Sequence, residues 1–184
     1  LLSGVMLGFL GSSLVSLVMA LSAGQGVQSA LYWLLGDLSR ARFESAGLAL
    51  VMAAVSVVGL MSMHRSIDTL LLGEEGALSL GTDVPRLRAR LLLFSSAIVA
   101  VCVSAAGMIG FIGLMVPHGA RAALGSKHRG VIPCAAVWGA AALVWSDLLA
   151  KNLLQPNEVP VGVVTSLVGA PIFLWMILRK TGSA

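Results

Sequence analysis

Residues 68–90, DTLLLGEEGALSLGTDVPRLRAR, decide how the rest of the chain is arranged. This stretch, called here the charged island, carries seven charged side chains. Apolar segments without formal charge lie on both sides of it. A group of charges this large cannot sit in hydrocarbon, so we expect the charged island to lie in water at one face of a membrane.

The charged island also has an apolar side. Its apolar residues recur at a spacing that gives a short helix one apolar face: Leu70, Leu71, Leu72, Ala77, Leu78 and Leu80. Helix-breaking residues are expected to divide that helix into pieces: Gly73, Gly76, Gly81 and Pro85. A broken amphipathic segment at a membrane surface is suited to docking another protein. The spacing alone fits a solvated loop between two spans equally well.

The composition indicates a polytopic membrane protein. Of 184 residues, 58% are hydrophobic and 11% are charged, whereas a soluble domain has roughly 25% charged residues. The net charge of +4 does not indicate nucleic-acid binding, because no Arg and Lys stripe with interleaved aromatics is present. Cys102 and Cys134 lie in apolar runs and are interpreted as small buried residues rather than a disulfide or a metal pair.

Six apolar segments are expected to cross the membrane, at about residues 1–21, 45–63, 91–107, 108–124, 131–150 and 160–178. The fourth should be partly irregular and the sixth broken in the middle, because of the residues Gly107, Gly110, Gly113, Pro117 and the run 169–171. A short interfacial helix is expected at residues 30–35, where Tyr32 and Trp33 favour the headgroup zone. The chain opens in apolar sequence without an initiator Met, so we expect an amino-terminal portion to be missing.

Basic residues predict the orientation of these spans. One set of loops holds nine of them: Arg65, Arg86, Arg88, Arg90, Arg121, Lys127, Arg129, Arg179 and Lys180. The other set holds three: Arg40, Arg42 and Lys151. Positively charged loops stay preferentially in the cytoplasm, so we expect the charged island and the carboxyl terminus there.

Sequence motifs for common enzyme chemistry are absent. The chain has no G-x-x-x-x-G-K-[ST], no H-E-x-x-H and no G-x-S-x-G. His64, His118 and His128 are far apart in sequence, which argues against a zinc site. His118 follows Pro117 and is expected to bond carbonyls freed by the proline rather than to act in catalysis.

Asp147 lies near the end of an apolar span, where an acid usually has a partner. Lys151 is four residues further on, so both side chains lie on one helix face and predict a local ion pair. The alternative is that Lys151 faces an acidic partner on the extracytoplasmic side of the membrane. Ser12 and Ser16 of the first span fit close helix packing, or else a polar path.

Several motifs together resemble one family. GFIGLMVPH at 110–118, followed by Arg121, resembles the signature of FecCD-type permeases, the membrane subunits of ABC importers for iron–siderophores, haem and vitamin B12. Further similar segments follow in the same order: His128-Arg129 with Pro133, Asp147, EVPVGVVT at 158–165 and GAPIFLW at 169–175. LGEE at 72–75 and SLG at 79–81 are similar to that family's cytoplasmic loop. The resemblance covers essentially the whole chain.

The resemblance implies an all-α permease of ten helices that pairs as a homodimer or pseudo-dimer in a bacterial inner membrane, with this chain corresponding to helices five to ten. It implies one transmembrane domain over residues 1–184, in which residues 67–87 form two short coupling helices that dock on a separate ATPase subunit. The residues implied at that contact are Leu72, Gly73, Glu74, Glu75, Leu78, Ser79, Leu80 and Gly81. No catalytic residue, resident metal or cofactor is implied.

Other roles also follow from the resemblance alone. Lys151 corresponds to a basic position that contacts a periplasmic or lipoprotein substrate-binding protein, although family members commonly have Arg there. Residues on the translocation path or with structural roles would be Ser12, Ser16, Trp33, Pro117, His118, Asp147 and Pro171. An iron chelate is the favoured cargo by family frequency, with haem and cobalamin compatible. The alternatives are an ion-coupled secondary transporter or channel and an intramembrane enzyme using Asp147 and His118.

Overall fold

The computed structural model describes residues 2–21, 25–39, 41, 43–152 and 159–181, and the regular structure in these residues is entirely helical. In chain order the helices are α1 (Leu2–Leu21), α2 (Gln25–Leu35), α3 (Phe43–Ser62), α4 (His64–Thr69), the 3-10 helix η1 (Leu70–Leu72), α5 (Glu74–Ser79), α6 (Val84–Ala106), α7 (Ile112–Leu124), α8 (His128–Asn152) and α9 (Val161–Thr181). The all-α prediction is therefore confirmed for the described residues.

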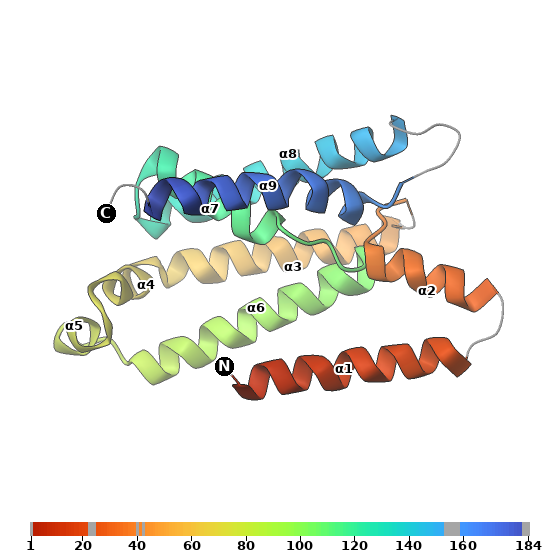
Figure 1. The fold of residues 1–184 in the computed structure, drawn as a ribbon. Helices are drawn as coiled ribbons and strands as arrows, with labels where there is room; N and C mark the ends of the chain where they lie inside the picture. The colour runs from red at the N-terminus through yellow and green to blue at the C-terminus, as the bar shows by residue number, and fades with distance from the viewer. Residues whose placement is uncertain (1, 22–24, 40, 42, 153–158, 182–184) are drawn as a thin grey trace.

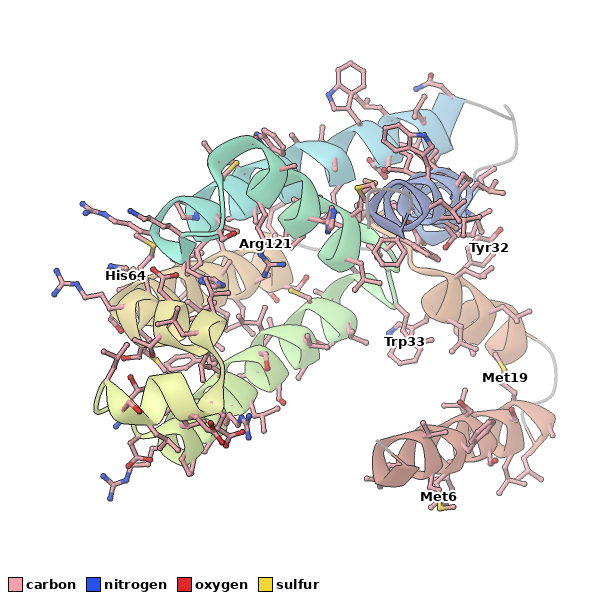
Figure 2. The ribbon with its side chains drawn as sticks, turned by 60° about the vertical axis from the view of Figure 1, so that its left-hand side comes forward. Met6, Met19, Tyr32, Trp33, His64 and Arg121 are labelled. Atoms are coloured by element: carbon pink, nitrogen blue, oxygen red, sulfur yellow. The ribbon has the colours of Figure 1, made fainter. Side chains whose placement is uncertain are left out.

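The long helices run side by side between two ends of the molecule (Figure 1). One end, called the island end, holds α4 and α5 together with the start of α6 and of α8 (Figure 1). The opposite end holds α2, the last turn of α8 and the first turn of α9 (Figure 1). Helix α8 packs against α3, α4, α7 and α9, so it contacts helices at both ends of the molecule. Figure 2 shows α1, with Met6 and Met19, standing apart from the other helices.

Four helices are long and apolar enough to cross a bilayer: α1, α3, α6 and α8. Helix α9 contributes a shorter apolar stretch, Val161–Met176. Helix α7 has only 13 residues, a length of about 20 Å, whereas the hydrocarbon core is about 30 Å thick. The six predicted spans thus correspond, among the described residues, to four long apolar helices, to α9 with its shorter apolar stretch, and to the short helix α7.

The predicted start of the third span was wrong. We expected it at Leu91, after the last arginine of the charged island, but α6 begins at Val84. The Asp83 carboxylate accepts a hydrogen bond from the backbone N–H of Arg86 at 3.1 Å, and Pro85 stands in the first turn. These are typical helix-start signals. Two helical turns bearing three arginines therefore precede the apolar part of α6.

Four other predicted breaks were also wrong, and the first of them, Gly113, lies inside α7. Pro117 lies inside α7, Pro171 lies inside α9, and Gly76 lies inside α5. The break predicted at Gly107 and Gly110 is confirmed, because α6 ends at Ala106 and α7 begins at Ile112. In this interruption Gly107 has φ +72° and Phe111, a non-glycine residue, has φ +66°. Phe111 packs over Gly169 of α9, where an added Cβ would lie 2.5 Å from the Cβ of Phe111.

Few described side chains are buried. One small core joins α8 to α9 through Ala150, Val161 and Val164. In the charged island, Ala77 and Val84 are fully buried. Most apolar side chains of the long helices are exposed on the isolated chain, α1 above all. Such surfaces require lipid or other protein segments to cover them.

Candidate functional site at the charged island and the opposite end of helix α8

The charged island folds as a small unit with an inner and an outer side. Its inner side holds Ala77, and the backbone N–H of Thr82 donates to the Ala77 carbonyl at 3.0 Å. The hydroxyls of Thr69 and Thr82 lie 2.9 Å apart and join α4 to the segment after α5. Gly73, with φ +88°, makes the sharp turn between η1 and α5. The unit is therefore closed by its own hydrogen bonds.

The outer side of the charged island is both apolar and acidic. Leu78 is 54% exposed and Leu80 is 62% exposed, and Leu71 and Leu72 are exposed beside them. Glu74 and Glu75 lie in the first turn of α5, where negative charge is favourable. Exposed leucines next to charges in a segment expected to lie in water are typical of a protein contact surface.

The two glutamates differ in their surroundings. Glu74 accepts a hydrogen bond from Arg88 of α6 at 2.9 Å, and both side chains are more than half exposed. An exposed pair of this kind contributes at most about 1 kcal/mol. The backbone carbonyl of Glu75 accepts from the Ser79 hydroxyl at 2.9 Å, within α5. The island's fold thus leaves the carboxylates of this turn at the surface.

A contact absent from our sequence expectations joins the charged island to α8. One oxygen of Asp68, Oδ1, accepts the backbone N–H of His128 at 2.9 Å and lies 2.7 Å from Nδ1 of the same residue. The side chain of Asp68 is 29% exposed and that of His128 is 13% exposed. His128 is the first residue of α8, so Asp68 caps this helix from a position 60 residues earlier in the chain.

The environment of Asp68 favours its charged form. Burial acts to raise the pKa of Asp68, but the backbone and side-chain hydrogen bonds of His128, with the charges of His128 and His64, outweigh it and lower the pKa below its ordinary value. A carboxyl with a lowered folded-state pKa stabilises the fold fully above its ordinary pKa and loses that effect only as the pH falls through the lowered value. Asp68 is therefore an anion at neutral pH.

His64 and His128 are distant in sequence, yet both act on Asp68. Their distance in sequence therefore does not keep them from sharing one carboxylate as a neighbour. Within the described ranges no group of three His, Cys, Asp or Glu residues is arranged to hold a metal ion.

At the opposite end, Asp147 and Lys151 form the ion pair that their spacing predicted, with Lys151 Nζ 2.7 Å from Asp147 Oδ2. The Asp147 oxygen Oδ1 is buried without a hydrogen-bond partner among the described residues. A small pocket here is lined by Tyr32, Asp37, Asp147, Lys151 and Pro160, among others. Figure 2 shows Tyr32 and Trp33 at this end and His64 at the island end.

Backbone contacts of three chain segments close the opposite end. Asp37 N donates to Ala106 O at 2.9 Å, Met108 N donates to Trp33 O at 3.2 Å, and Gly162 N donates to Gly36 O at 3.4 Å. The approach is so close that a Cβ at Gly162 would overlap the carbonyl of Leu35, and a Cβ at Gly107 would overlap the carbonyl of Trp33. We call residues 33–37, 106–108 and 160–162 the glycine junction.

The remaining predicted site residues do not gather in one place. Ser12 and Ser16 are exposed on α1, Trp33 is exposed on α2, and Pro171 is exposed on α9. His118 is half-buried in α7 and makes none of the side-chain hydrogen bonds found in the described part of the chain. The expected bond from His118 to a carbonyl freed by Pro117 is therefore not formed.

Sequence reasoning missed the pairing of Asp68 with His128 and the glycine junction. No local signal reports a contact between residues 60 positions apart. For the junction, a signal existed, because Gly36 directly precedes the charged segment 37–44 and Gly162 lies within the motif at 158–165. A glycine at the end of an apolar run often marks close backbone approach.

Comparison with known proteins places this arrangement in a family. The model of the FecCD transport family matches residues 1–179. The vitamin B12 import system permease protein BtuC of Vibrio parahaemolyticus is 40% identical over 180 residues, which cover 98% of this chain and 54% of the relative. The hemin transport system permease protein HmuU of Yersinia pestis is 38% identical over 181 residues, again 98% of this chain and 54% of the relative.

Two further comparisons agree. The Fe(3+) dicitrate transport system permease protein FecD of Escherichia coli is 40% identical over 178 residues, or 97% of this chain and 56% of the relative. An inward-facing structure of a metal-chelate type ABC transporter superposes with a TM-score of 0.89 at 30% identity, covering 96% of this chain and 57% of that one. The chain therefore spans about half the length of the relatives it matches. Its sequence over residues 1–179 and its helical arrangement make the chain a member of the FecCD transport family.

Proposed function

We propose that this chain is part of the permease subunit of an ABC importer that moves an iron chelate, haem or cobalamin across a bacterial cytoplasmic membrane. Membership of the FecCD family and relatives named for vitamin B12, hemin and ferric dicitrate transport support this class. A separate subunit hydrolyses ATP, a binding protein delivers the cargo, and a second permease copy completes the path. An iron chelate is the favoured cargo on family frequency.

The outer face of the charged island is the proposed docking surface for the ATPase. The observation that carries this assignment is the exposure of Leu72, Leu78 and Leu80 on short helices whose inner side is already packed. An apolar face in an aqueous segment gains free energy when a partner covers it, at about 25 cal/mol per Å². Glu74 and Glu75 add charges that would orient the partner.

Orientation in the membrane follows from charge. In the sequence, the loops predicted to share a side with the charged island hold nine basic residues, and the loops predicted on the other side hold three. We infer that the charged island and the carboxyl terminus face the cytoplasm, where an ATPase is available. Lys151 then faces the outside and is the proposed contact for acidic residues of the binding protein.

The enzyme alternative is not favoured by the geometry. Asp147 is engaged in an ion pair with Lys151, and His118 is not among the residues that line the pocket beside that pair. A general base and its partner must lie within hydrogen-bond reach of a shared substrate. These two residues therefore do not form one site.

Reversing both glutamates of α5 tests the docking surface. In the full-length complex, Glu74→Arg with Glu75→Arg is expected to reduce the ATPase subunit that co-purifies by at least about tenfold, because like charges placed across an interface cost several kcal/mol. Quantitative co-purification from detergent measures this. Retained assembly together with retained ATP-driven uptake would contradict the assignment.

The ion pair of Glu74 with Arg88 requires a control. Adding Arg88→Glu to the double variant re-forms this pair with the charges exchanged but leaves the outer face reversed. Assembly should remain lost in the triple variant. Arg88→Ala alone removes the pair and should assemble normally. If Arg88→Ala loses as much ATPase as the double reversal, the island's own fold, not docking, explains the result.

Lys151 is expected to contribute to binding-protein affinity. Lys151→Ala should weaken the binding of the substrate-binding protein to the reconstituted permease by roughly threefold to tenfold, the usual effect of losing one exposed charge contact. Lys151→Arg should retain or strengthen binding, since guanidinium pairs with carboxylates in two-point geometry. Surface plasmon resonance on both variants measures the change. Because the Asp147 pair is also lost, Asp147→Asn serves as its control, and an equal loss there would refute a direct contact.

A further inference from the structure

Helix α8 joins the two ends of the molecule. It runs for 25 residues from His128 to Asn152, a length of about 37 Å at the usual rise per residue. Its first residue contacts the charged island, and its last turn carries the Asp147–Lys151 pair. One continuous helix therefore runs from the charged island to the turn that carries Lys151 (Figure 1).

The way α8 is attached to the charged island differs from that of its neighbours. Helix α3 leads into the island through α4, and α6 leaves it directly, so both follow the island's movement through the peptide chain. Helix α8 starts at residue 128, well beyond the island in the chain. Helix α8 can therefore follow the island only through non-covalent contacts. Such contacts exist, because α4 packs against α8.

The Asp68–His128 contact is suited to that task. Asp68 Oδ1 accepts from both the backbone N–H and the ring of His128, at 2.9 and 2.7 Å. A bond to the backbone fixes the end of the helix itself, whereas a bond to a side chain alone would let the rotamer absorb a displacement. The positive end of the helix dipole and the carboxylate charge strengthen the contact.

The far end of α8 is also firmly held. Ala150 is almost fully buried against Val161 and Val164 of α9, and the Val159 N–H donates to the Ala150 carbonyl at 3.4 Å. Helix α8 continues through Pro133 as one helix, and a helix anchored at both ends is expected to pass a displacement along its length, since packed interiors have low compressibility and transmit strain. A tilt at His128 is thus passed to the turn that carries Lys151.

We propose that Asp68 and His128 form the joint through which α8 follows the charged island, so that α8 carries movement between the ATPase-docking face and the binding-protein face. This inference rests on the proposed function. Both are positioning residues, because neither lies on the proposed docking face. Energetic coupling between distant sites needs an element that both sites bias, and α8 meets that requirement.

The test uses the full-length permease with its ATPase subunit and binding protein, reconstituted in lipid vesicles. The variants are Asp68→Ala, His128→Ala, the double variant and the conservative Asp68→Asn. Three quantities are measured: co-purifying ATPase, the stimulation of ATP hydrolysis by the binding protein, and uptake. Arg129→Ala, an exposed residue next to the joint, is the matched control.

In the alanine variants we expect co-purification within about twofold of wild type, while stimulation and uptake fall by about twofold to thirtyfold, the range of measured coupling effects. The double variant should be no worse than the more affected single variant, because the two residues act through one contact. Asp68→Asn should recover part of the stimulation, since its amide oxygen still accepts the backbone bond. Arg129→Ala should behave as wild type.

Stimulation and uptake within twofold of wild type in both single variants would overturn the inference and leave the proposed function standing. Loss of assembly in both Asp68→Ala and Asp68→Asn would also overturn it, because the contact would then be needed for folding alone. A wild-type complex without ATP-dependent uptake would overturn the proposed function, and the joint with it.

Discussion

Replacing Gly162 by alanine is expected to remove most of the folded protein from the membrane. A Cβ at this position would overlap the carbonyl of Leu35 and lie 3.2 Å from the carbonyl oxygen of Met108. Both obstacles are backbone, so no side-chain rotamer change relieves them. Overpacking typically costs about 1–3 kcal/mol, and a marginally stable protein loses much of its folded population at that cost. The Gly162–Gly36 bond of the glycine junction would be lost as well.

The readout for this variant is the yield of monodisperse protein after extraction together with its thermal midpoint. Gly113→Ala is the matched control, because Gly113 lies in α7 with open space around its missing Cβ. Alanine there should hold or raise the midpoint, since glycine in a helix costs about 0.5–1 kcal/mol relative to alanine. If Gly162→Ala has the yield and thermal midpoint of wild type, the backbone of the glycine junction can shift to make room for a Cβ, and the prediction is wrong.

Charging the apolar face of the charged island is expected to abolish ATP-driven uptake without unfolding the membrane part. Leu78 and Leu80 are both more than half exposed, so Leu78→Asp with Leu80→Asp buries no charge within this chain. In the complex, the two aspartates would be desolvated at the centre of the contact. Apolar anchors of that kind commonly contribute about 2 kcal/mol or more each, so uptake should fall by roughly a hundredfold or more.

Vesicle uptake and co-purification of the ATPase measure this second effect, with the thermal midpoint of the permease recorded alongside. The paired substitution Leu78→Met with Leu80→Met keeps the surface apolar and should stay within about twofold of wild type. If the aspartate variant transports normally, the apolar face is not the docking surface. If its thermal midpoint falls sharply, the leucines serve the island's own fold instead.

Hydropathy and charge were sufficient to predict the helical class, the position of the charged island and most helix locations. Period and length are strong signals in uncharged runs such as residues 45–63, which agree with α3 within two residues at each end. The start of α6 was missed because the three arginines were used to end the apolar span, and the helix-start signal of Asp83 and Pro85 was not considered. Charge excludes a residue from the bilayer, but it does not exclude it from a helix.

The two interior prolines show a second limit. Pro117 and Pro171 were expected to interrupt helices, yet α7 and α9 continue through them. In a membrane, opening a helix exposes several backbone groups, whereas a proline frees only one carbonyl, so the continuous helix costs less. The chain does open at residues 107–111, where Gly107 and Gly110 predicted a break, because there the Ala106 carbonyl and the Met108 N–H find partners in residues 37 and 33.

The joint between Asp68 and His128 could not have been predicted from spacing. Both residues belong to charged segments that local reasoning assigns to solvent, and only the packing of α4 on α8 brings them together. The Asp147–Lys151 pair could be predicted, because four residues along a helix define a distance in advance. A contact within one helix can be predicted from residue spacing, whereas a helix cap supplied by a distant part of the chain cannot.

Phe111 and Gly169 carry an evolutionary consequence. Phe111 holds a left-handed backbone conformation that a bulky side chain adopts only at a cost, and its Cβ occupies the space that a side chain at 169 would need. A residue larger than glycine at position 169 would clash with Phe111 as long as the chain keeps its present turn at 111. The two positions should therefore covary during evolution, because the residue at one of them limits which residues the other tolerates.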